Sequence, residues 1–368
     1  MKFKTNTSPF FSSENNVRSV MLQVLIALIP GTLVVAYFYG WGILINVALS
    51  VFFALALEAL ALILRKRPVL PFLGDFSALI TGWLLALALP PLIPWWVIFV
   101  GVFFAIIVAK HLYGGLGYNP FNPAMVGFAV LIISFPLELT QWIQAGHISA
   151  ISTLNQIQPL GFLESIKSVL GIAASAPDWD AITMATPLDA VKTGLRAGTP
   201  YSDIISQSPY LAKTPSNTWL WSGLAFTLGG LWLLYKKVIH WQIPVALITS
   251  LIIISGLFHL FSSDTYATPL LHVFSGATIL AAFFIATDPV SASTTPTGKI
   301  LYGAGIGLLI YIIRTWGNYP DAVAFAVLIM NMAVPTIDYY TQPRTFGYGS
   351  AIRKSHSKQP STKEENKS

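Results

Sequence analysis

Cysteine is absent from this sequence of 368 residues, and charged residues account for only 10% of it. Without cysteine the chain forms no disulfide framework and ligates no iron–sulfur cluster by itself. Its six histidines show no metal-ligand spacing, so no metal site is predicted, and no complete catalytic centre is evident. Soluble domains are about a quarter charged. A charge content this low, beside 54% hydrophobic residues, therefore indicates an integral membrane protein.

Apolar runs predict an all-α polytopic membrane protein with ten transmembrane helices, because each run can cross a hydrocarbon core at about 1.5 Å per residue. The first membrane half, 1–139, contains runs at about 20–39, 42–64, 77–93, 95–111 and 123–139. The second half, 218–343, contains runs at about 218–235, 241–261, 270–287, 300–316 and 321–338. A long polar loop, 140–217, separates the halves, and a basic tail, 344–368, is predicted to be disordered.

The lysines and arginines predict which side of the membrane each segment faces. Ten crossings place both termini on one side, and 16 of the 21 basic residues fall on that side. The exceptions are Arg314 in a short loop opposite and, in the long loop, Lys167, Lys192, Arg196 and Lys213. By the positive-inside rule both termini are cytoplasmic, and residues 140–217 are periplasmic in a bacterial inner membrane. The net charge of +6 thus reflects topology and not nucleic-acid binding, and no cleaved signal peptide is predicted.

Two short sequences recur at nearly one spacing, which predicts that the two halves are repeats. Phe76-Ser-Ala recurs as Phe274-Ser-Gly, 198 positions later (274 − 76), and Phe128-Ala-Val-Leu-Ile recurs as Phe325-Ala-Val-Leu-Ile, 197 positions later (325 − 128). Chance similarity between aliphatic segments is the alternative. Because five crossings is an odd number, the second half would be inverted, giving the 5+5 arrangement by which transporters frame a central site.

Within the long loop, local chemistry predicts a helix that begins at Thr186. Threonine is a favoured N-cap, Pro187 suits the first helical position, and Asp189 follows in capping-box spacing. The N-terminus of a helix carries partial positive charge and favours a phosphate. One interpretation is a capped surface helix, and the other is a threonine hydroxyl that carries a phosphoryl group.

The residues before the cap favour the second interpretation. Asp180, Thr183, Ala185 and Thr186 match the pattern Asp-x-x-Ser/Thr-x-Ala-Thr. This pattern resembles the site at which a flavin transferase joins the phosphate of FMN to the final threonine. A hydroxyl can form that phosphodiester without an acid–base partner on its own chain. A match to so short a pattern also arises by chance, so the pattern alone leaves the capped helix ahead.

Two similar sequences are rejected as flavin sites. Ser275-Gly-Ala-Thr278 has His272 in place of the aspartate, and its threonine lies about 12 Å inside a predicted crossing, beyond the reach of a soluble transferase. Thr268 faces the outer side, but Ser262 stands where the pattern requires aspartate.

Polar loops on the cytoplasmic side offer further candidates. Gly115, Asn119 and Asn122 lie in residues 114–123, where glycine permits close approach and asparagine supplies uncharged donors and acceptors. This loop is a candidate flavin or ion site, although the same residue types fill any tight connection. Asp288 lies in a hydroxyl-rich turn, residues 285–299, whose oxygens suit a hard cation or a flavin edge. The alternative there is a capped loop at the lipid interface.

Glu58 is the candidate for an ion path. It precedes Arg65 by roughly 10 Å along the helix, which places its carboxylate inside the hydrocarbon region. Carboxylates at this depth are costly and usually face the protein interior, where they serve ion or proton transfer. The alternatives are a protonated acid or a structural hydrogen bond. Asp75, nearby in the sequence, is a potential partner of the basic residues 65–67.

Several motifs occur in one order along nearly the whole chain. They are Ser8-Pro, Met21-Leu-Gln-Val-Leu-Ile-Ala-Leu-Ile-Pro30-Gly, the loop from Lys110 to Pro123, residues 180–189, Ser275-Gly-Ala-Thr, Ala286-Thr-Asp-Pro and Asp321-Ala-Val-Ala-Phe-Ala-Val. Together they resemble the D subunit of the Rnf/Rsx ion-translocating oxidoreductase complex. The chain is similar more distantly to the B subunit of the sodium-pumping NADH:quinone reductase. Because several ordered motifs are more specific than one, the resemblance favours flavinylation of Thr186.

The resemblance implies a ten-helix subunit with FMN esterified to Thr186, Asp180 serving recognition by a flavin transferase and Thr183 belonging to the same motif. It also implies a noncovalent riboflavin or second flavin near the membrane. The complex would move electrons between NADH and ferredoxin, or another acceptor, and couple this to Na⁺ or H⁺ transport. Partner subunits would supply the NADH site and the iron–sulfur centres. This chain would relay electrons and form part of the ion path, for which Glu58 and Asp288 are candidates.

Two other functions remain open from the sequence. A solute channel or transporter of the five-plus-five type would use residues 140–217 as a structural cap and would carry no flavin. A purely structural assembly subunit would tolerate Thr186→Ala without loss of turnover by the complex.

Overall fold

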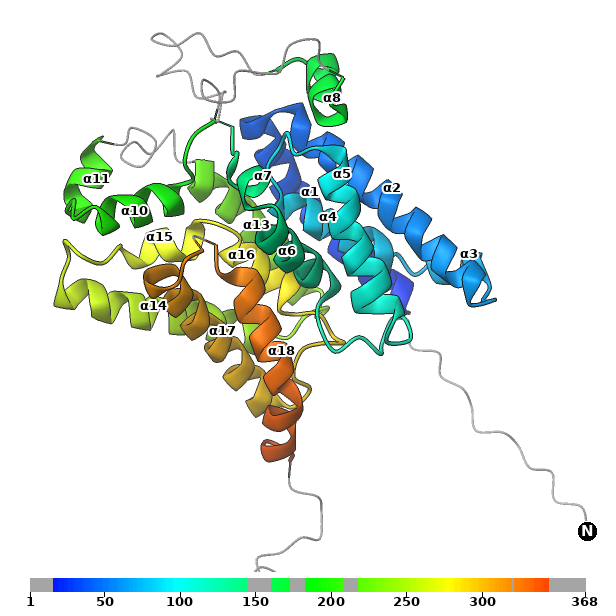
Figure 1. Cartoon of the computed structure of the whole chain (residues 1–368). Coiled ribbons are helices and arrows are strands. Elements are labelled where there is room, and N and C mark those ends of the chain that lie inside the picture. Colours follow the sequence, from blue (N-terminus) through cyan, green and yellow to red (C-terminus); the bar gives the residue numbers. More distant parts are fainter. Residues whose placement is uncertain (1–15, 144–159, 173–182, 208–217, 320, 344–368) are drawn as a thin grey trace, which may run out of the picture.

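The computed structural model describes residues 16–143, 160–172, 183–207, 218–319 and 321–343 (Figure 1). Apart from one isolated β-bridge, helices are the only regular secondary structure of these residues. Within these described ranges, five helices are long and apolar enough to cross a membrane. They are α1 (Val17–Tyr39), α2 (Trp41–Leu64), α14 (Gln242–Phe261), α17 (Pro296–Trp316) and α18 (Val323–Tyr340). The predicted all-helical, membrane-spanning class is therefore confirmed at this level, while the count of ten crossings stays a prediction.

The other helices of the two halves pack among these five. In the first half these are α3 (Val69–Leu73), α4 (Ser77–Ala88), α5 (Trp95–Phe103) continuing as the π-helix η1 (Phe104–His111), α6 (Pro123–Ser134) and α7 (Pro136–Thr140). In the second half they are α13 (Thr218–Tyr235), α15 (Pro269–Phe274), α16 (Thr278–Leu280) and the π-helix η3 (Ala281–Ile285). The predicted runs at 42–64, 218–235 and 241–261 agree with α2, α13 and α14 to within one residue.

Three predicted continuous runs are wrong because the chain breaks them. The run at 77–93 ends as a helix at Ala88, just before a proline-rich segment, 90–94, that cannot continue it. The run at 123–139 divides at Phe135 into α6 and α7. The run at 270–287 divides at Ser275 to Ala277, where Gly276 has a φ of 65°, a left-handed conformation that glycine adopts without strain.

The helices of the polar loop lie toward one end of the molecule. In Figure 1, α8 (Phe162–Leu170) lies at the top above the first half, and α10 (Pro187–Arg196) and α11 (Tyr201–Gln207) lie at the upper left, whereas α18 ends at the lower edge. A small apolar cluster fixes α10 and α11 onto the second half. Its buried members are Val191, Tyr201, Ile204, Ala267 and Leu271. Thr186 is thereby held against the membrane body by packing outside the spans.

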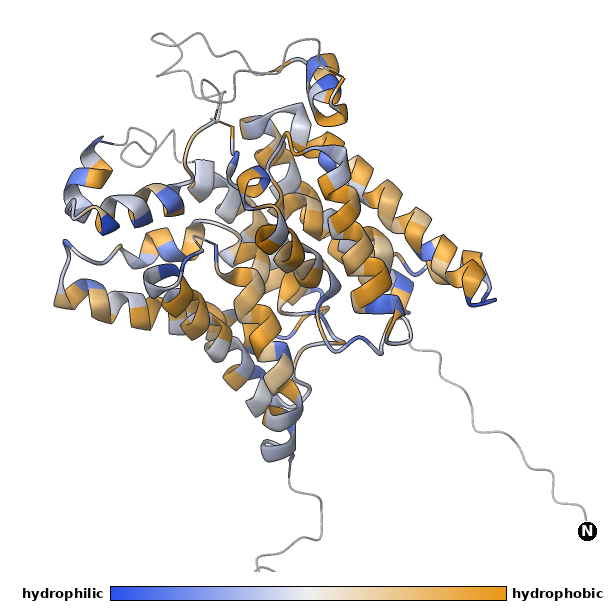
Figure 2. Ribbon diagram, in the orientation of Figure 1, coloured by the Kyte–Doolittle hydropathy of each residue, from blue (hydrophilic) through white to orange (hydrophobic). Residues whose placement is uncertain are grey.

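Apolar side chains fill the interior and also cover the outward faces of the long helices (Figure 2). Phe52, Leu228 and Leu257 are examples, each more than 60% exposed. So extensive an exposed apolar surface indicates contact with lipid. The interior contains side chains from both halves in one continuous cluster, so the halves form one body.

Glycine allows the close approach of α1 and α13. A Cβ added at Gly229 would lie 2.0 Å from the backbone oxygen of Ala27, which cannot move aside as a side chain can. Small residues commonly permit such contacts between membrane helices. We expect Gly229→Ala to lower the free energy of unfolding in detergent by about 1–3 kcal/mol, the usual cost of overpacking.

Gly256→Ala on α14 is the matched control, because its Cβ would meet only Pro269 Cγ, at 3.8 Å. Alanine favours a helix interior over glycine by about 0.5–1 kcal/mol, so this change should be neutral or stabilising. Denaturant titration of both variants followed by circular dichroism compares them. Equal destabilisation at the two positions would contradict the close-packing account of Gly229.

Candidate functional site

Thr186 is the N-cap of α10, as the sequence predicted. Its backbone is extended, and its Oγ accepts a hydrogen bond from the backbone N–H of Asp189 at 3.2 Å. Pro187 occupies the first helical position, where no N–H is needed. Since the cap uses Oγ as an acceptor, a substituent that replaces the hydroxyl proton is compatible with it.

A cavity of about 120 Å³ adjoins Thr186 between the two halves. Its aromatic walls are Tyr39, Trp142, Trp219, Phe226 and Phe274. Among the described residues, the buried indole Nε1 of Trp219 has no hydrogen-bond partner. Aliphatic residues and the polar side chains of Ser222 and Asp321 complete the lining. A buried donor without a partner beside aromatic side chains marks a place where a planar ligand with polar edge atoms would be stabilised.

The segment that precedes Thr186 lies against one wall of this cavity. Thr183 pairs with Ile143 in an isolated antiparallel bridge, and the N–H of Met184 donates to the carbonyl of Trp142 at 2.8 Å. Asp180, the first residue of the flavinylation pattern, lies outside the described residues. Between Thr183 and Thr186, the backbone of the pattern is thus hydrogen-bonded to Trp142.

Of the two rejected threonines, Thr278 differs from Thr186 in accessibility, whereas Thr268 is partly buried as Thr186 is. Thr278 is fully buried, and its hydroxyl donates to the carbonyl of His272 at 3.0 Å. Thr268 caps α15, with its Oγ 3.0 Å from the hydroxyl of Tyr201 on α11. Burial confirms that Thr278 is not a surface site, and Thr268 is partly covered by the outer helices.

A larger cavity, of about 600 Å³, lies at the opposite end of the body. Helix α1 contributes residues to both cavities, Tyr39 to the one beside Thr186 and Val17 to this one, so α1 runs from one to the other. Asn119, Asn122 and Asp288 all line the larger cavity, which brings together three candidates distant in sequence.

The asparagines of this cavity differ in how they are bonded. Asn122 caps α6 through Met125 N–H, and its Nδ2 donates across the interface to the carbonyl of Ile285 at 3.1 Å. Asn119 Nδ2 donates to the carbonyl of Phe121, while its buried Oδ1 has no partner within the described part of the chain. Gly115 is not among the lining residues, and its N–H donates to the carbonyl of Lys110.

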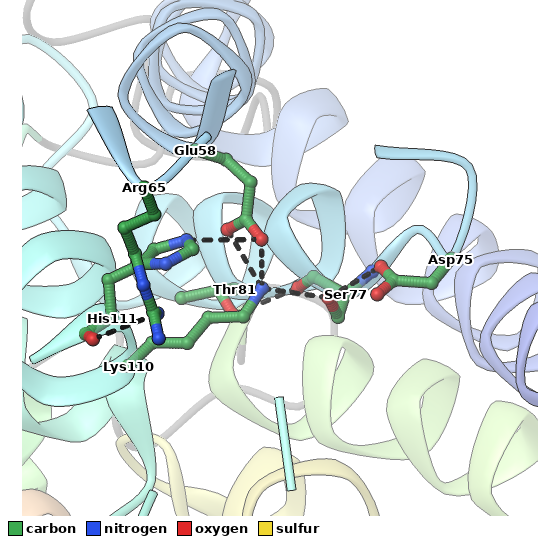
Figure 3. A network of polar contacts seen from close by, with 7 residues as sticks. All are labelled: Glu58, Arg65, Asp75, Ser77, Thr81, Lys110 and His111. Atoms are coloured by element: carbon green, nitrogen blue, oxygen red, sulfur yellow. Dashed lines mark hydrogen bonds and ion pairs between the residues drawn. The ribbon is translucent and has the colours of Figure 1, made fainter. Parts of the chain in front are cut away.

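Glu58 forms a buried ion pair that the sequence did not predict (Figure 3). Lys110 Nζ lies 2.8 and 2.9 Å from the two carboxylate oxygens, and His111 Nε2 lies 3.3 Å from Oε1. Glu58 is 3% exposed and Lys110 1% exposed. A carboxylate held between two potential cations is neither isolated nor freely accessible, so any ion that uses Glu58 must compete with Lys110.

The network extends from Lys110 to the beginning of α4 (Figure 3). Lys110 Nζ donates to Ser77 Oγ at 2.8 Å, and Ser77 donates from both its N–H and its hydroxyl to Asp75 Oδ1, at 2.7 and 2.6 Å. The suggested partnership of Asp75 with residues 65–67 is thus replaced by a bond to Ser77. Instead, Arg65 donates to the carbonyl of His111 at 3.3 Å.

Lys110 also lines the 600 Å³ cavity. The network therefore places one buried ammonium group beside the candidate loop, with its charge balanced by Glu58. The signal for this pairing in the sequence is weak, since Lys110-His111 ends an apolar run and Glu58 lies within another. Only their packing shows that the two helices bring these residues together.

Comparison with known proteins gives one consistent family. The model of the NQR2, RnfD, RnfE family matches residues 4–347. The chain is 50% identical to the D subunit of the ion-translocating oxidoreductase complex of Aliivibrio salmonicida (strain LFI1238), over 95% of this chain and 99% of that protein. It is 49% identical to the D subunit from Vibrio vulnificus (strain YJ016), covering 95% and 100%, and 49% identical to that from Yersinia enterocolitica serotype O:8, covering 93% and 97%.

Proposed function

The chain belongs to the NQR2, RnfD, RnfE family, and from that premise we propose that it carries FMN joined covalently to Thr186 and relays electrons within an ion-translocating complex. Its family and its long apolar helices make it a multi-pass membrane protein. Its relatives, about half identical over nearly the full length, are named as subunits of an ion-translocating oxidoreductase complex. This similarity makes the chain a membrane subunit of such a translocase, with other subunits as its partners.

The observation that carries the flavin proposal is the position of Thr186. Its Oγ is available at the N-terminus of a ten-residue helix, and that terminus favours the negative charge of a phosphodiester. The aromatic side chains of the adjoining cavity and the unpartnered Nε1 of Trp219 offer contacts for one edge of a flavin ring. When bound, FMN supplies electron transfer in single steps. The chain's own task is to hold the ring at the outer end of the membrane body.

We propose the larger cavity as the site of a second, noncovalent flavin such as riboflavin. Its volume of about 600 Å³ lies in the range of small-molecule sites, and apolar walls with a few convergent polar groups are typical of them. Asn119 Oδ1 would accept a hydrogen bond from the ligand, and the backbone near Gly117, with a φ of 91°, allows close approach. Covalent attachment plays no part here.

We propose that the two sites lie on opposite faces of a bacterial inner membrane, with ten helices in a 5+5 inverted repeat and both termini in the cytoplasm. Several observations support this arrangement. Both halves contain a broken third element, at Gly74 to Phe76 in the first and at Ser275 to Ala277 in the second. The two cavities also lie at opposite ends of α1. Glu58 and Asp288 are the proposed ion-path residues beside the cytoplasmic cavity.

Flavin fluorescence tests the covalent site directly. The full chain, expressed together with its flavin transferase, should give a fluorescent band under ultraviolet light after denaturing electrophoresis, because only a covalent flavin survives denaturation. A non-fluorescent band of unmodified mass would overturn the proposal. It would favour the alternative of a solute channel or transporter, in which the outer loop is a structural cap.

Asn119→Leu tests the noncovalent site. We expect the amount of flavin that is released from the purified chain by denaturation to fall severalfold, because one hydrogen bond contributes about 0.5–1.5 kcal/mol. Ser250→Ala on α14 is the control, since its hydroxyl donates within its own helix to Leu247. Thermal unfolding checks that both variants fold. Equal flavin content in the two variants would assign Asn119 a loop-stabilising role alone.

A further inference from the structure

Arg314 is a buried cation that none of the proposed flavin or ion sites uses. It lies near the C-terminal end of α17 and is 4% exposed. Its guanidinium donates to the carbonyl of His272 at 2.6 Å, to the carbonyl of Ser275 at 3.2 Å and to Thr278 Oγ at 2.8 Å. Arg314 therefore binds both sides of the break between α15 and α16.

The first half contains a comparable arrangement, but there the charge is balanced. Lys110, near the end of η1, donates to Ser77 at the beginning of α4 and is paired with Glu58 at 2.8 Å. The position 198 residues after Glu58 is Gly256, which has no carboxylate. The nearest acidic contact of Arg314 is Asp321 Oδ1 at 3.7 Å, on a residue that is one quarter exposed. Among the described residues, the counter-ion of the buried charge in the second half is thus a single, partly exposed carboxylate at a longer distance than that between Glu58 and Lys110.

A cavity of about 230 Å³ adjoins Arg314 at the same end of the body as Thr186. Two further basic residues, Lys192 and Arg196 on α10, line it. Lys192 donates to the carbonyl of Tyr319 at 2.8 Å, and Arg196 donates to the carbonyl of Gly317 at 2.8 Å. These partners are neutral carbonyls, so they orient the cations without cancelling their charge.

The charge around Lys192 supports this interpretation. Burial, and then the nearby charges of Arg196 and Arg314, lower the pKa of Lys192 to about 8, while Asp189 acts in the opposite direction. Lys192 lies on α10 outside the spans. Burial is the largest cause of this shift, and the two arginines add to it, so three cations lie near one another here with Asp189 acting against them.

Two buried nitrogen atoms at this cavity also have no hydrogen-bond partner among the residues that the structure describes. They are Nε of Arg314 and Nδ1 of His272, and both residues line the cavity. Both side chains are more than nine-tenths buried, at 4% and 6% exposed. Buried polar groups in folded proteins nearly always have a partner, so a ligand in this cavity would satisfy both nitrogen atoms.

We propose that this cavity binds a phosphate group, either of an anionic phospholipid headgroup or of a free phosphate ion. Three cations on two separate elements approach the cavity, and a phosphate offers enough acceptor oxygens to serve them together with His272. The anion would supply the counter-charge that Glu58 supplies to Lys110 in the first half. The site is separate from the flavin site, because Thr186 does not line it.

Binding measurements on the full chain in detergent test this site. Titration calorimetry with inorganic phosphate and native mass spectrometry with short-chain phosphatidylglycerol distinguish the two sources. In the double variant Lys192→Gln/Arg196→Gln we expect binding to weaken roughly tenfold to a hundredfold, because charge-assisted hydrogen bonds to the phosphate are lost. Lys167→Gln on α8 removes one charge elsewhere in the outer loop and should leave binding unchanged.

A second variant tests the same site if the double variant fails to fold. His272→Leu removes one unpartnered nitrogen and no charge, and it should weaken binding severalfold while thermal unfolding still shows a folded chain. Thr186→Val should retain full binding, which separates this site from the flavin. Weakened binding of either ligand supports the proposal and identifies its source. No binding to wild type, or equal binding by Lys167→Gln and the double variant, overturns it.

Discussion

Replacing Thr186 with valine is expected to remove all covalent flavin from the chain. The phosphodiester requires a hydroxyl oxygen, and valine matches threonine in shape but lacks that oxygen. The helix would also lose its cap, because Asp189 N–H donates to Thr186 Oγ. Loss of a cap costs about 1 kcal/mol. Because α10 lies outside the membrane spans and is held by its own apolar cluster, the body of the protein should stay folded.

Intact-protein mass spectrometry measures the result most directly. Wild type should carry one FMN adduct and Thr186→Val none, with electron transfer by the complex falling to background. Thr186→Ser keeps both hydroxyl and cap and should retain the adduct, which separates chemistry from helix stability. Thr268→Val should also retain it, since that threonine contacts Tyr201 and lacks the full pattern. An adduct that persists in Thr186→Val would refute the assignment.

Local sequence chemistry predicted the outer helix well. Threonine, proline and aspartate at fixed spacing define a helix start by interactions within four residues, and α10 begins where they place it. Long runs without proline or glycine breaks, such as α2, were also predicted to within one residue. Their ends are set by local charge and turn residues, which a single sequence displays.

Breaks inside apolar segments were not predicted, because length and hydropathy do not detect them. The segment from 270 to 287 is apolar over most of its length, yet Gly276 adopts a left-handed conformation and Arg314 binds the freed carbonyls of His272 and Ser275. The compensating cation comes from α17, about forty residues later in the chain. A break that is satisfied by a distant side chain leaves little trace in its own sequence.

Glu58 illustrates the same limit for the candidate site. Its depth in the membrane predicted a special role, but its partner could not be named, because Lys110 is 52 positions away on another helix. The positive-inside rule placed Lys110 in a cytoplasmic loop, whereas its side chain is buried. Likewise, the sequence did not predict that Trp219 lines a cavity, since a single tryptophan at the start of an apolar helix is common.

Breaking the pair between Glu58 and Lys110 is expected to have the largest effect on stability. Removal of one partner of a buried ion pair typically costs about 3–5 kcal/mol, because the other charge is left uncompensated. Glu58→Leu leaves Lys110 with Ser77 alone, so we expect the full cost. Lys110→Met should cost less, because His111 Nε2 stays 3.3 Å from Glu58 Oε1 as a second partner of the carboxylate.

The double variant Glu58→Leu/Lys110→Met distinguishes a role of the pair in ion transport from a structural role. Replacing both charges by apolar groups of similar size is often neutral, so the free energy of unfolding in detergent should return close to wild type. Ion transport by the complex in vesicles is then the informative measurement, since folding no longer limits it. Restored stability with lost transport would mean that an ion uses the Glu58 carboxylate. Restored stability with normal transport would make the pair a structural link between α2 and η1, and the ion path would have to run elsewhere, with Asp288 the remaining candidate.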